Sequence, residues 1–243
     1  SSDISDYHGE WDVLGKLKTV DGSFTTSSQW GTGNVNIEPQ GSVVVTNNSN
    51  GSLFVFDNTL SGSGTLLVNF SGSENGTDLY TPTFKIQQGT TSEFTGMVEL
   101  AGEKNKKVVY ILDSDELSTS GIRVSDNSVL SVGRDDSSKE TFTLGKLDIA
   151  GGELNIGDIQ TGSPTSNKTI RVTKKLNADG EGTVRIDTSA GFINAVPTTE
   201  SELETLPLME QDDGLQKTSM MLVNAKGAEI IGSGGGLSLV DQN

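Results

Sequence analysis

The chain has 243 residues, of which 30 are glycine, one is histidine and none is cysteine, and only 32% are hydrophobic. This length permits one large all-β domain or an array with a substantial core, and the composition suits turns and thin strands better than helical cores. Seventeen Lys and Arg against 33 Asp and Glu give a formal charge of −16, which argues against nucleic acid and anionic lipid as partners. The lack of cysteine excludes disulfides and thiolate metal sites.

The first 32 residues show no sustained hydrophobic period, and they hold both tryptophans and the histidine, His8. We therefore expect residues 1–32 to form an N-terminal capping segment. From Gly33 onward, apolar residues two positions apart alternate with turns rich in Gly, Pro and Asn. The first such steps are Val35 with Ile37, Val43 with Val45, and Leu53 with Val55. Each step predicts a short strand with its apolar side chains on one face.

The same alternation continues as far as residue 186. No stretch of helical period exceeds two turns, so an α/β fold is excluded for want of crossover helices. The inward-facing candidates after Val55 are Leu66, Val68, Phe70, Phe84, Ile86, Phe94, Val98, Leu100, Val109, Ile111, Ile122, Val124, Leu130, Val132, Phe142, Leu144, Leu147, Ile149, Leu154, Ile156, Ile170, Val172, Val184 and Ile186.

The clearest structural unit is residues 147–158, LDIAGGELNIGD, in which Gly151-Gly152 joins two apolar steps. A glycine followed by alternating apolar residues recurs at irregular spacing, from Gly51, Gly64, Gly96, Gly152, Gly182 and Gly236. Irregular spacing suits successive rungs with loops of different length better than a fixed-length repeat. A rung of about 20–25 residues predicts a coil of roughly ten rungs over residues 33–243.

Residues 195–221 interrupt this pattern. Ser201 with Glu204 forms a weak capping box, and Pro207 stops any helix there. We expect an insertion that projects from the coil as a loop or as a helix of one or two turns.

Four phrases carry a family resemblance: LSGSGTLLVNF, FTGMVELAG, LDIAGGELNIGD and LVNAKGAEIIGSGGGLSLVDQN. They resemble the passenger domains of Gram-negative autotransporters of the adhesin type, and the resemblance runs from Gly33 to Asn243. It implies an all-β fold, a right-handed parallel β-helix or β-solenoid. It also implies export through the outer membrane to the bacterial cell surface, where the protein acts in adhesion, self-association or biofilm formation.

The chain differs from a full-length autotransporter because it lacks a signal peptide and the strands of the membrane barrel. We therefore expect an excised passenger fragment that does not itself insert into the membrane. It also lacks the Gly-Asp-Ser-Gly context of the family's serine-protease branch, so the resemblance does not extend to that activity.

Acidic clusters are the candidates for chemistry, because parallel β-helices also host polysaccharide lyases and hydrolases that use paired carboxylates or Ca²⁺. The clusters are Asp113 with Asp115 and Glu116, Asp135 with Asp136, and Asp212 with Asp213. Leu117 occupies a ligand position that an EF-hand loop requires, so the first cluster is not such a loop. Aromatic residues suited to stacking on sugars make up only 5% of the chain. We expect no catalytic residue, no metal and no cofactor, with a carbohydrate-active enzyme as the alternative and a passive stalk as a third hypothesis.

Two basic groups stand out against the acidic background, Lys104 with Lys106 and Lys107, and the pair Lys174-Lys175. Loops from different rungs can align on one face of a coil, where they would pair with opposite charge on another copy; the alternative is isolated, solvated loop tips. The predicted binding residues are Lys104, Lys106, Lys107, Asp113, Asp115, Asp135 and Asp136. The expected partner is another copy of the chain, a host surface protein or a glycan.

Overall fold

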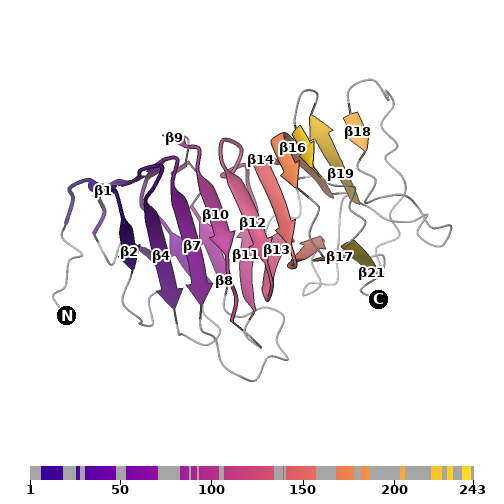
Figure 1. Ribbon diagram of the computed structural model, residues 1–243, viewed down its shortest axis with the longest axis horizontal. Helices are drawn as coiled ribbons and strands as arrows, with labels where there is room; N and C mark the ends of the chain where they lie inside the picture. The colour runs from indigo at the N-terminus through magenta and orange to yellow at the C-terminus, as the bar shows by residue number, and fades with distance from the viewer. Residues whose placement is uncertain are drawn as a thin grey trace.

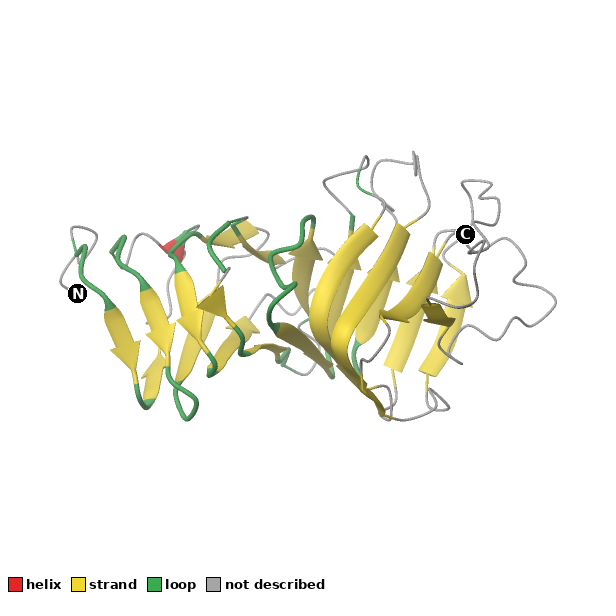
Figure 2. Cartoon of the chain, turned by 90° about the horizontal axis from the view of Figure 1, so that it is seen from above, coloured by secondary structure: helices red, strands yellow, loops and turns green. Residues whose placement is uncertain are grey.

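The computed structural model of the protein is all-β and elongated, with strands stacked side by side along its long axis (Figures 1 and 2). It describes residues 7–18, 26–27, 31–47, 53–70, 83–87, 89–91, 93–103, 107–133, 139, 141–156, 168–177, 182–186, 203–205, 220–225, 229–231 and 237–241.

The chain passes through three sheets, A, B and C, in a fixed order. One circuit consists of β3 (Val35–Ile37) in sheet A, β4 (Ser42–Asn47) in sheet B and β5 (Leu53–Phe56) in sheet C. The next circuit repeats this order with β6, β7 and β8, and each of these strands pairs in parallel with its counterpart in the circuit before. The chain is therefore a coil of parallel strands, as the alternation predicts.

The other strands continue the three sheets. Sheet A also holds β1 (Trp11–Val13), β6 (Leu60–Gly62) and β9 (Glu93–Phe94). Sheet B also holds β2 (Lys16–Lys18), β7 (Thr65–Phe70), β10 (Met97–Leu100), β12 (Gly121–Ser125), β14 (Thr141–Ala150), β16 (Lys168–Asn177), β18 (Leu203–Thr205), β19 (Met220–Ala225) and β20 (Glu229–Ile231). Sheet C also holds β8 (Thr83–Ile86), β11 (Val108–Leu112), β13 (Ser128–Val132), β15 (Glu153–Ile156), β17 (Gly182–Ile186) and β21 (Leu237–Asp241).

The described part of the coil has eight circuits, one for each parallel strand of sheet B from β2 to β19. Sequence spacing predicts roughly ten, from a rung of about 20–25 residues. The difference arises because the circuits are unequal: Val43 pairs with Leu66, Leu66 with Val98, and Ile170 with Leu222. Loops of different length enter between strands whose pairing stays regular.

Parallel pairing begins inside the segment predicted as a cap. Strand β1 pairs with β3 and β2 with β4, and Trp11 packs against the hydrophobic core. Three-residue strands are too short to show a hydrophobic period, so the sequence pattern starts later than the coil does.

The predicted insertion at 195–221 contains a strand where a helix was one of the two expectations. Residues 203–205 form β18, which pairs antiparallel with β19. Pairing with an available sheet edge outweighs a weak capping box. Met220 and Met221 begin β19, and the other residues of this segment lie outside the described part of the chain.

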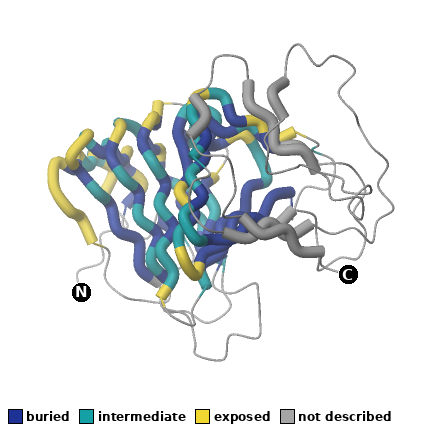
Figure 3. Tube along the Cα trace, turned by 45° about the vertical axis from the view of Figure 1, so that its right-hand side comes forward, coloured by how far each residue is buried: buried dark blue, intermediate teal, exposed yellow. Residues whose placement is uncertain are grey.

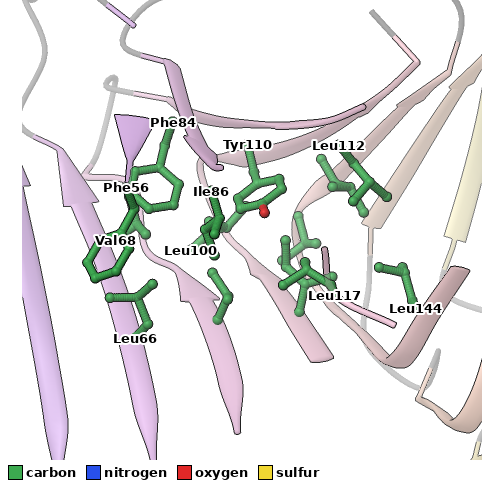
Figure 4. Close-up of a cluster of buried hydrophobic side chains, with 14 of the residues drawn as sticks. Phe56, Leu66, Val68, Phe84, Ile86, Leu100, Tyr110, Leu112, Leu117 and Leu144 are labelled. Carbon is green, nitrogen blue, oxygen red and sulfur yellow. The ribbon is translucent and has the colours of Figure 1, made fainter. Parts of the chain in front are cut away.

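The core fills the space enclosed by the three sheets. Buried and half-buried residues alternate along β7 and β10, so their buried side chains face the inside of the coil. Figure 3 shows such alternation as changes of colour along the chain. Phe54, Phe84 and Tyr110 stack on successive circuits of sheet C, with ring centroids 5.8 and 5.7 Å apart. Figure 4 shows Phe84 and Tyr110 among the aliphatic side chains of sheets B and C.

Two strands of sheet C have the opposite facing to that predicted. In β5 the inward residues are Phe54 and Phe56, and in β11 they are Val108, Tyr110 and Leu112. The predicted inward residues Leu53, Val55, Val109 and Ile111 therefore point outward. Both strands are apolar at every position, LFVF and VVYIL, so their sequences contain no alternation that fixes the facing.

Glycine fills the corner between sheets A and B, where backbones of successive circuits are in contact. A Cβ on Gly41 would lie 1.9 Å from the Val13 oxygen, and one on Gly96 would lie 2.0 Å from the Gly64 oxygen. The next residue in each case donates its N–H to the preceding circuit, as Met97 does to Gly64 at 3.1 Å. Two of the recurrent glycines of the sequence, Gly64 and Gly96, are therefore residues of this corner.

The unit at 147–158 contains the second kind of corner, as predicted. Leu147 and Ile149 are buried in β14, and Leu154 is buried in β15. Gly151 turns the chain between the two sheets with a φ of +92°, a conformation that favours glycine.

Candidate functional site

The acidic cluster Asp113, Asp115 and Glu116 lies in the turn between β11 and β12, residues 113–120, which we call the acidic corner. Sheet A ends at β9 in the previous circuit, so this turn occupies the position where its next strand would lie. Leu117 is fully buried and fills the core at that point. The acidic corner therefore closes one side of the coil without a strand.

Glu116 points into the protein and is only 5% exposed. The Tyr110 hydroxyl donates to its Oε1 at 3.1 Å, and the Ser114 hydroxyl donates to its Oε2 at 2.5 Å. The Thr91 hydroxyl donates to the backbone oxygen of Glu116. Tyr110 ends the aromatic stack of sheet C, so its phenol needs a partner inside the core, and Glu116 supplies one.

Burial raises the pKa of Glu116 from 4.5 to about 7, against the opposing effect of the hydrogen bond from Ser114. Burial also raises the pKa of Tyr110 well above its ordinary value, and the negative charge of Glu116 adds to that rise. Both groups are therefore held toward their neutral, protonated forms.

The other two carboxylates of the acidic corner bind neighbouring circuits. Asp115 accepts hydrogen bonds from Lys139 at 3.0 Å and from the backbone N–H of Thr143 at 2.7 Å. Asp113 lies 3.8 Å from the ammonium of Lys85 in β8. The acidic corner thus joins the circuits on both sides of it.

This geometry favours a structural role for the cluster. Glu116 is inaccessible to a substrate, and Asp113 and Asp115 each have a cationic partner. Within the described ranges, no group of three or more His, Asp or Glu side chains is arranged to hold a metal ion.

Lys107 is the described member of the predicted basic patch, and it forms a salt bridge of 3.0 Å with Glu153 of sheet C. Lys174 and Lys175 lie in β16 of sheet B, whereas Lys107 directly precedes β11 of sheet C. His8 is exposed, and its Nδ1 lies 2.5 Å from the Thr32 hydroxyl. Lys104, Lys106, Asp135, Asp136, Asp212 and Asp213 lie outside the described residues.

The outside of sheet B carries a charged surface that we call the basic face: Arg123, Lys146, Arg171, Lys174 and Lys175. The sequence pattern singled out the pair Lys174-Lys175 and did not indicate the other three. Arg123 lies in β12, Lys146 in β14, and the other three in β16. Lys146 and Lys175 are paired in register on adjacent strands. Arg123, Lys146 and Arg171 stand next to inward apolar residues in the sequence, so they were recognisable as outward positions of strands. A single cation at such a position is common on any strand, so the sequence did not indicate that these residues lie on neighbouring strands.

Acidic residues lie beside these cations. Asp148 lies 3.4 Å from the Arg123 guanidinium, Glu99 is the register partner of Arg123 on β10, and Glu229 is the register partner of Lys175 on β20. Lys174 reaches toward the acidic corner and donates to the Thr119 carbonyl oxygen at 2.7 Å.

Comparison with known proteins finds a similarity to a bacterial protein. The chain is 29% identical over 245 residues, 99% of its length, to an uncharacterized protein, YuaQ, of Escherichia coli strain K12. It spans 16% of the length of that protein. No family model and no solved structure matches the chain.

Among the described residues, no helix is both long enough and apolar enough to cross a membrane.

Proposed function

We propose that this chain is part of the passenger region of an adhesin-type autotransporter, exported through the outer membrane and displayed on the bacterial cell surface. In this proposal its three parallel sheets form a right-handed β-helix. It acts in adhesion, self-association or biofilm formation through its long outer faces, and its partner is another copy, a host surface protein or a glycan.

The observation that carries the proposal is the division of polar groups between the inside and the outside of the coil. The polar side chains of the acidic corner are hydrogen-bonded or ion-paired within the protein. On the outside of sheet B, Glu99, Arg123 and Asp148 follow one another in register on successive strands. Such a coil offers an extended, repeating surface, which suits binding better than catalysis at a single centre.

Adhesion is tested by displaying the chain on a non-adherent bacterium and measuring clumping and attachment to host cells. We expect either clumping or attachment to exceed that of the same bacterium without the chain. A display strain that does neither contradicts the proposal.

The stalk hypothesis makes a different prediction, because a spacer tolerates removal of a whole circuit. Ser42 pairs in register with Thr65, so deleting residues 42–64 removes one circuit and leaves the strands aligned. A spacer keeps its behaviour in this variant, whereas a binding face that includes the removed circuit loses attachment.

The enzyme hypothesis predicts release of reducing or unsaturated sugar from acidic polysaccharides, lost when Asp135 and Asp136 are both replaced by Asn. The described geometry favours it less, because each carboxylate of the acidic corner is engaged by the protein itself.

A further inference from the structure

We propose that the acidic corner is a pH-sensitive cover over the end of sheet A. The cover is closed while Glu116 is protonated. It opens as a local unit, with the strands around it still paired, when Glu116 loses its proton. This inference is independent of the proposed function, because it concerns the opening of one turn and requires no partner.

The acidic corner covers β9, and within the described ranges sheet A has no strand beyond β9. The Thr119 hydroxyl donates to the Phe94 carbonyl oxygen of β9 at 2.8 Å. Thr91, just before β9, donates its hydroxyl to the backbone oxygen of Glu116. Hydroxyl groups therefore meet this sheet edge at the place where a strand would otherwise pair. An edge strand that loses such a cover presents unpaired backbone groups to solvent or to another strand.

The acidic corner is attached by individual hydrogen bonds and by one buried side chain. Gly145 donates its N–H to the Leu117 oxygen, and Lys146 donates its N–H to the Ser120 oxygen, both at 2.9 Å. The Leu117 side chain lies with Tyr110 in the buried cluster of Figure 4. A turn held in this way has fewer contacts to break than a strand paired on both sides. It can therefore open at a lower free energy than the whole coil.

Glu116 is the part of this attachment that responds to pH. Its carboxyl is 5% exposed and is bonded to the hydroxyls of Tyr110 and Ser114. No cation among the described residues contacts it. An ionised carboxylate at this position is a buried charge without a counter-ion, which is unfavourable, whereas the protonated carboxyl carries no such penalty.

The groups around Glu116 do not offset its charge. Asp113 adds negative charge, and burial raises the pKa of Glu116 to about 7. Tyr110 stays neutral, because burial raises its pKa as well. The nearby ammonium groups are engaged elsewhere: Lys85 with Asp113, Lys139 with Asp115, and Lys174 with the Thr119 oxygen.

The competing hypothesis is that Glu116 ionises in place. The hydroxyls of Tyr110 and Ser114 would then solvate the carboxylate, and the acidic corner would stay closed at every pH. The two hypotheses differ in whether backbone amides bonded to the corner become accessible to water as the pH rises.

Hydrogen–deuterium exchange of the folded chain at pH 5.5 and pH 8, with and without about 1 M urea, tests the inference. The reporter amides are those of Ser118, which donates to the Asp115 oxygen, and of Gly145, which donates to the Leu117 oxygen. The reference amides are those of Leu130 and Val132 in β13, a strand paired on both sides.

The reporter amides should be less protected than the reference amides at both pH values. After correction for the intrinsic exchange rate, we expect protection of the reporters to fall about twentyfold from pH 5.5 to pH 8, since the pKa of Glu116 is about 7 when closed and 4.5 when exposed. Urea should change reporter protection little, because local opening exposes little surface, and should lower reference protection.

Two results overturn the inference. If reporter and reference amides share one protection factor and one urea dependence, the acidic corner opens only when the whole coil unfolds. If reporter protection does not change with pH, Glu116 ionises in place.

Two variants assign the titrating group. Glu116→Gln keeps an acceptor for Tyr110 and does not titrate, so the pH effect on the reporters should fall below about twofold. The matched control is Asp115→Asn, which removes the neighbouring carboxylate and its bond to Lys139. It should open more at both pH values and keep the twentyfold ratio.

A pH effect that persists in Glu116→Gln, or one that disappears in Asp115→Asn, overturns the role of Glu116. Circular dichroism checks that both variants are folded. If Glu116→Gln does not fold, the wild type and Asp115→Asn still decide between the two hypotheses.

Discussion

The Tyr110 hydroxyl donates a 3.1 Å hydrogen bond to the Glu116 carboxyl inside the coil, where Glu116 is 5% exposed. Tyr110 continues the aromatic stack of sheet C, and Glu116 belongs to the turn that replaces a strand of sheet A. This contact places a titratable group in the core of the circuit in which a turn replaces the strand of sheet A.

Glu116 predicts a pH dependence of stability. Its pKa in the folded protein is about 7, above its ordinary value of 4.5. Its contribution is therefore fully present below pH 4.5 and is lost as the pH rises from 4.5 to 7. Between pH 5.5 and pH 8 we expect this group to lower the free energy of unfolding by about 2 kcal/mol.

Chemical denaturation of the wild type and of Glu116→Gln at both pH values measures this effect. Glutamine keeps a side-chain acceptor for Tyr110 and does not titrate, so the variant should lose about 2 kcal/mol of the pH-dependent difference. Asp148→Asn, on the outer face, is the control and should keep it. If the free energy of unfolding changes equally between pH 5.5 and pH 8 in the wild type and in Glu116→Gln, the prediction is wrong.

The corner glycines predict strong position dependence for alanine. Gly96→Ala places a Cβ 2.0 Å from the Gly64 oxygen, so the backbones must separate, and we expect a loss of about 2 kcal/mol or more. A Cβ on Gly15 meets nothing within 4 Å, so Gly15→Ala is the control and should change stability by less than about 0.5 kcal/mol. Thermal unfolding of the two variants decides the matter, and similar shifts in Tm would argue against the backbone contact.

Ser120 holds the equivalent corner position where most circuits have glycine. Its carbonyl oxygen accepts from Lys146 N–H at 2.9 Å, but its buried hydroxyl has no hydrogen-bond partner among the described residues. Removing a buried unpaired hydroxyl should stabilise the protein, so we expect Ser120→Ala to gain about 1 kcal/mol.

Ser128 provides the comparison. It is also buried, but its hydroxyl donates to the Ser125 oxygen at 2.5 Å, so Ser128→Ala should lose about 1 kcal/mol. Denaturant titration of both variants measures whether each substitution raises or lowers the free energy of unfolding. A loss of stability in Ser120→Ala would show that its hydroxyl has a partner in solution.

Asn58 binds one circuit to the preceding one. Its amide donates to the Gly31 oxygen at 2.7 Å and to the Gly33 oxygen at 2.8 Å, both in a buried place. Asn58→Ala leaves two buried carbonyl oxygens without this donor, and we expect a loss of about 2–3 kcal/mol. Asn36→Ala removes hydrogen bonds to the accessible carboxylates of Asp12 and Glu38 and one from Ser61, whose partners water can replace, so it should cost less than Asn58→Ala in the same unfolding measurement. Equal losses would contradict the role given to burial.

The alternation of apolar residues predicted short strands and no crossover helices, whereas their parallel pairing is set by the tertiary structure. It identified the inward residues wherever polar residues alternate with them, as at Ile122 with Val124 and at Phe142 with Leu144. It also located the corner at Gly151-Gly152, because a glycine pair between two alternating steps has few other uses. These features are local, and a side-chain period of two is visible in the sequence itself.

Only the tertiary structure decided the features that depend on neighbouring circuits. The facing of β5 and β11 is set by pairing with adjacent strands, because both strands are apolar throughout. The roles of Glu116 and Lys107 depend on partners in other strands, Tyr110 and Glu153. The basic face assembles residues from Arg123 to Lys175 because parallel pairing brings their strands side by side. Because the loops differ in length, the sequence separation between paired residues is irregular, and the pairs cannot be identified from the sequence alone.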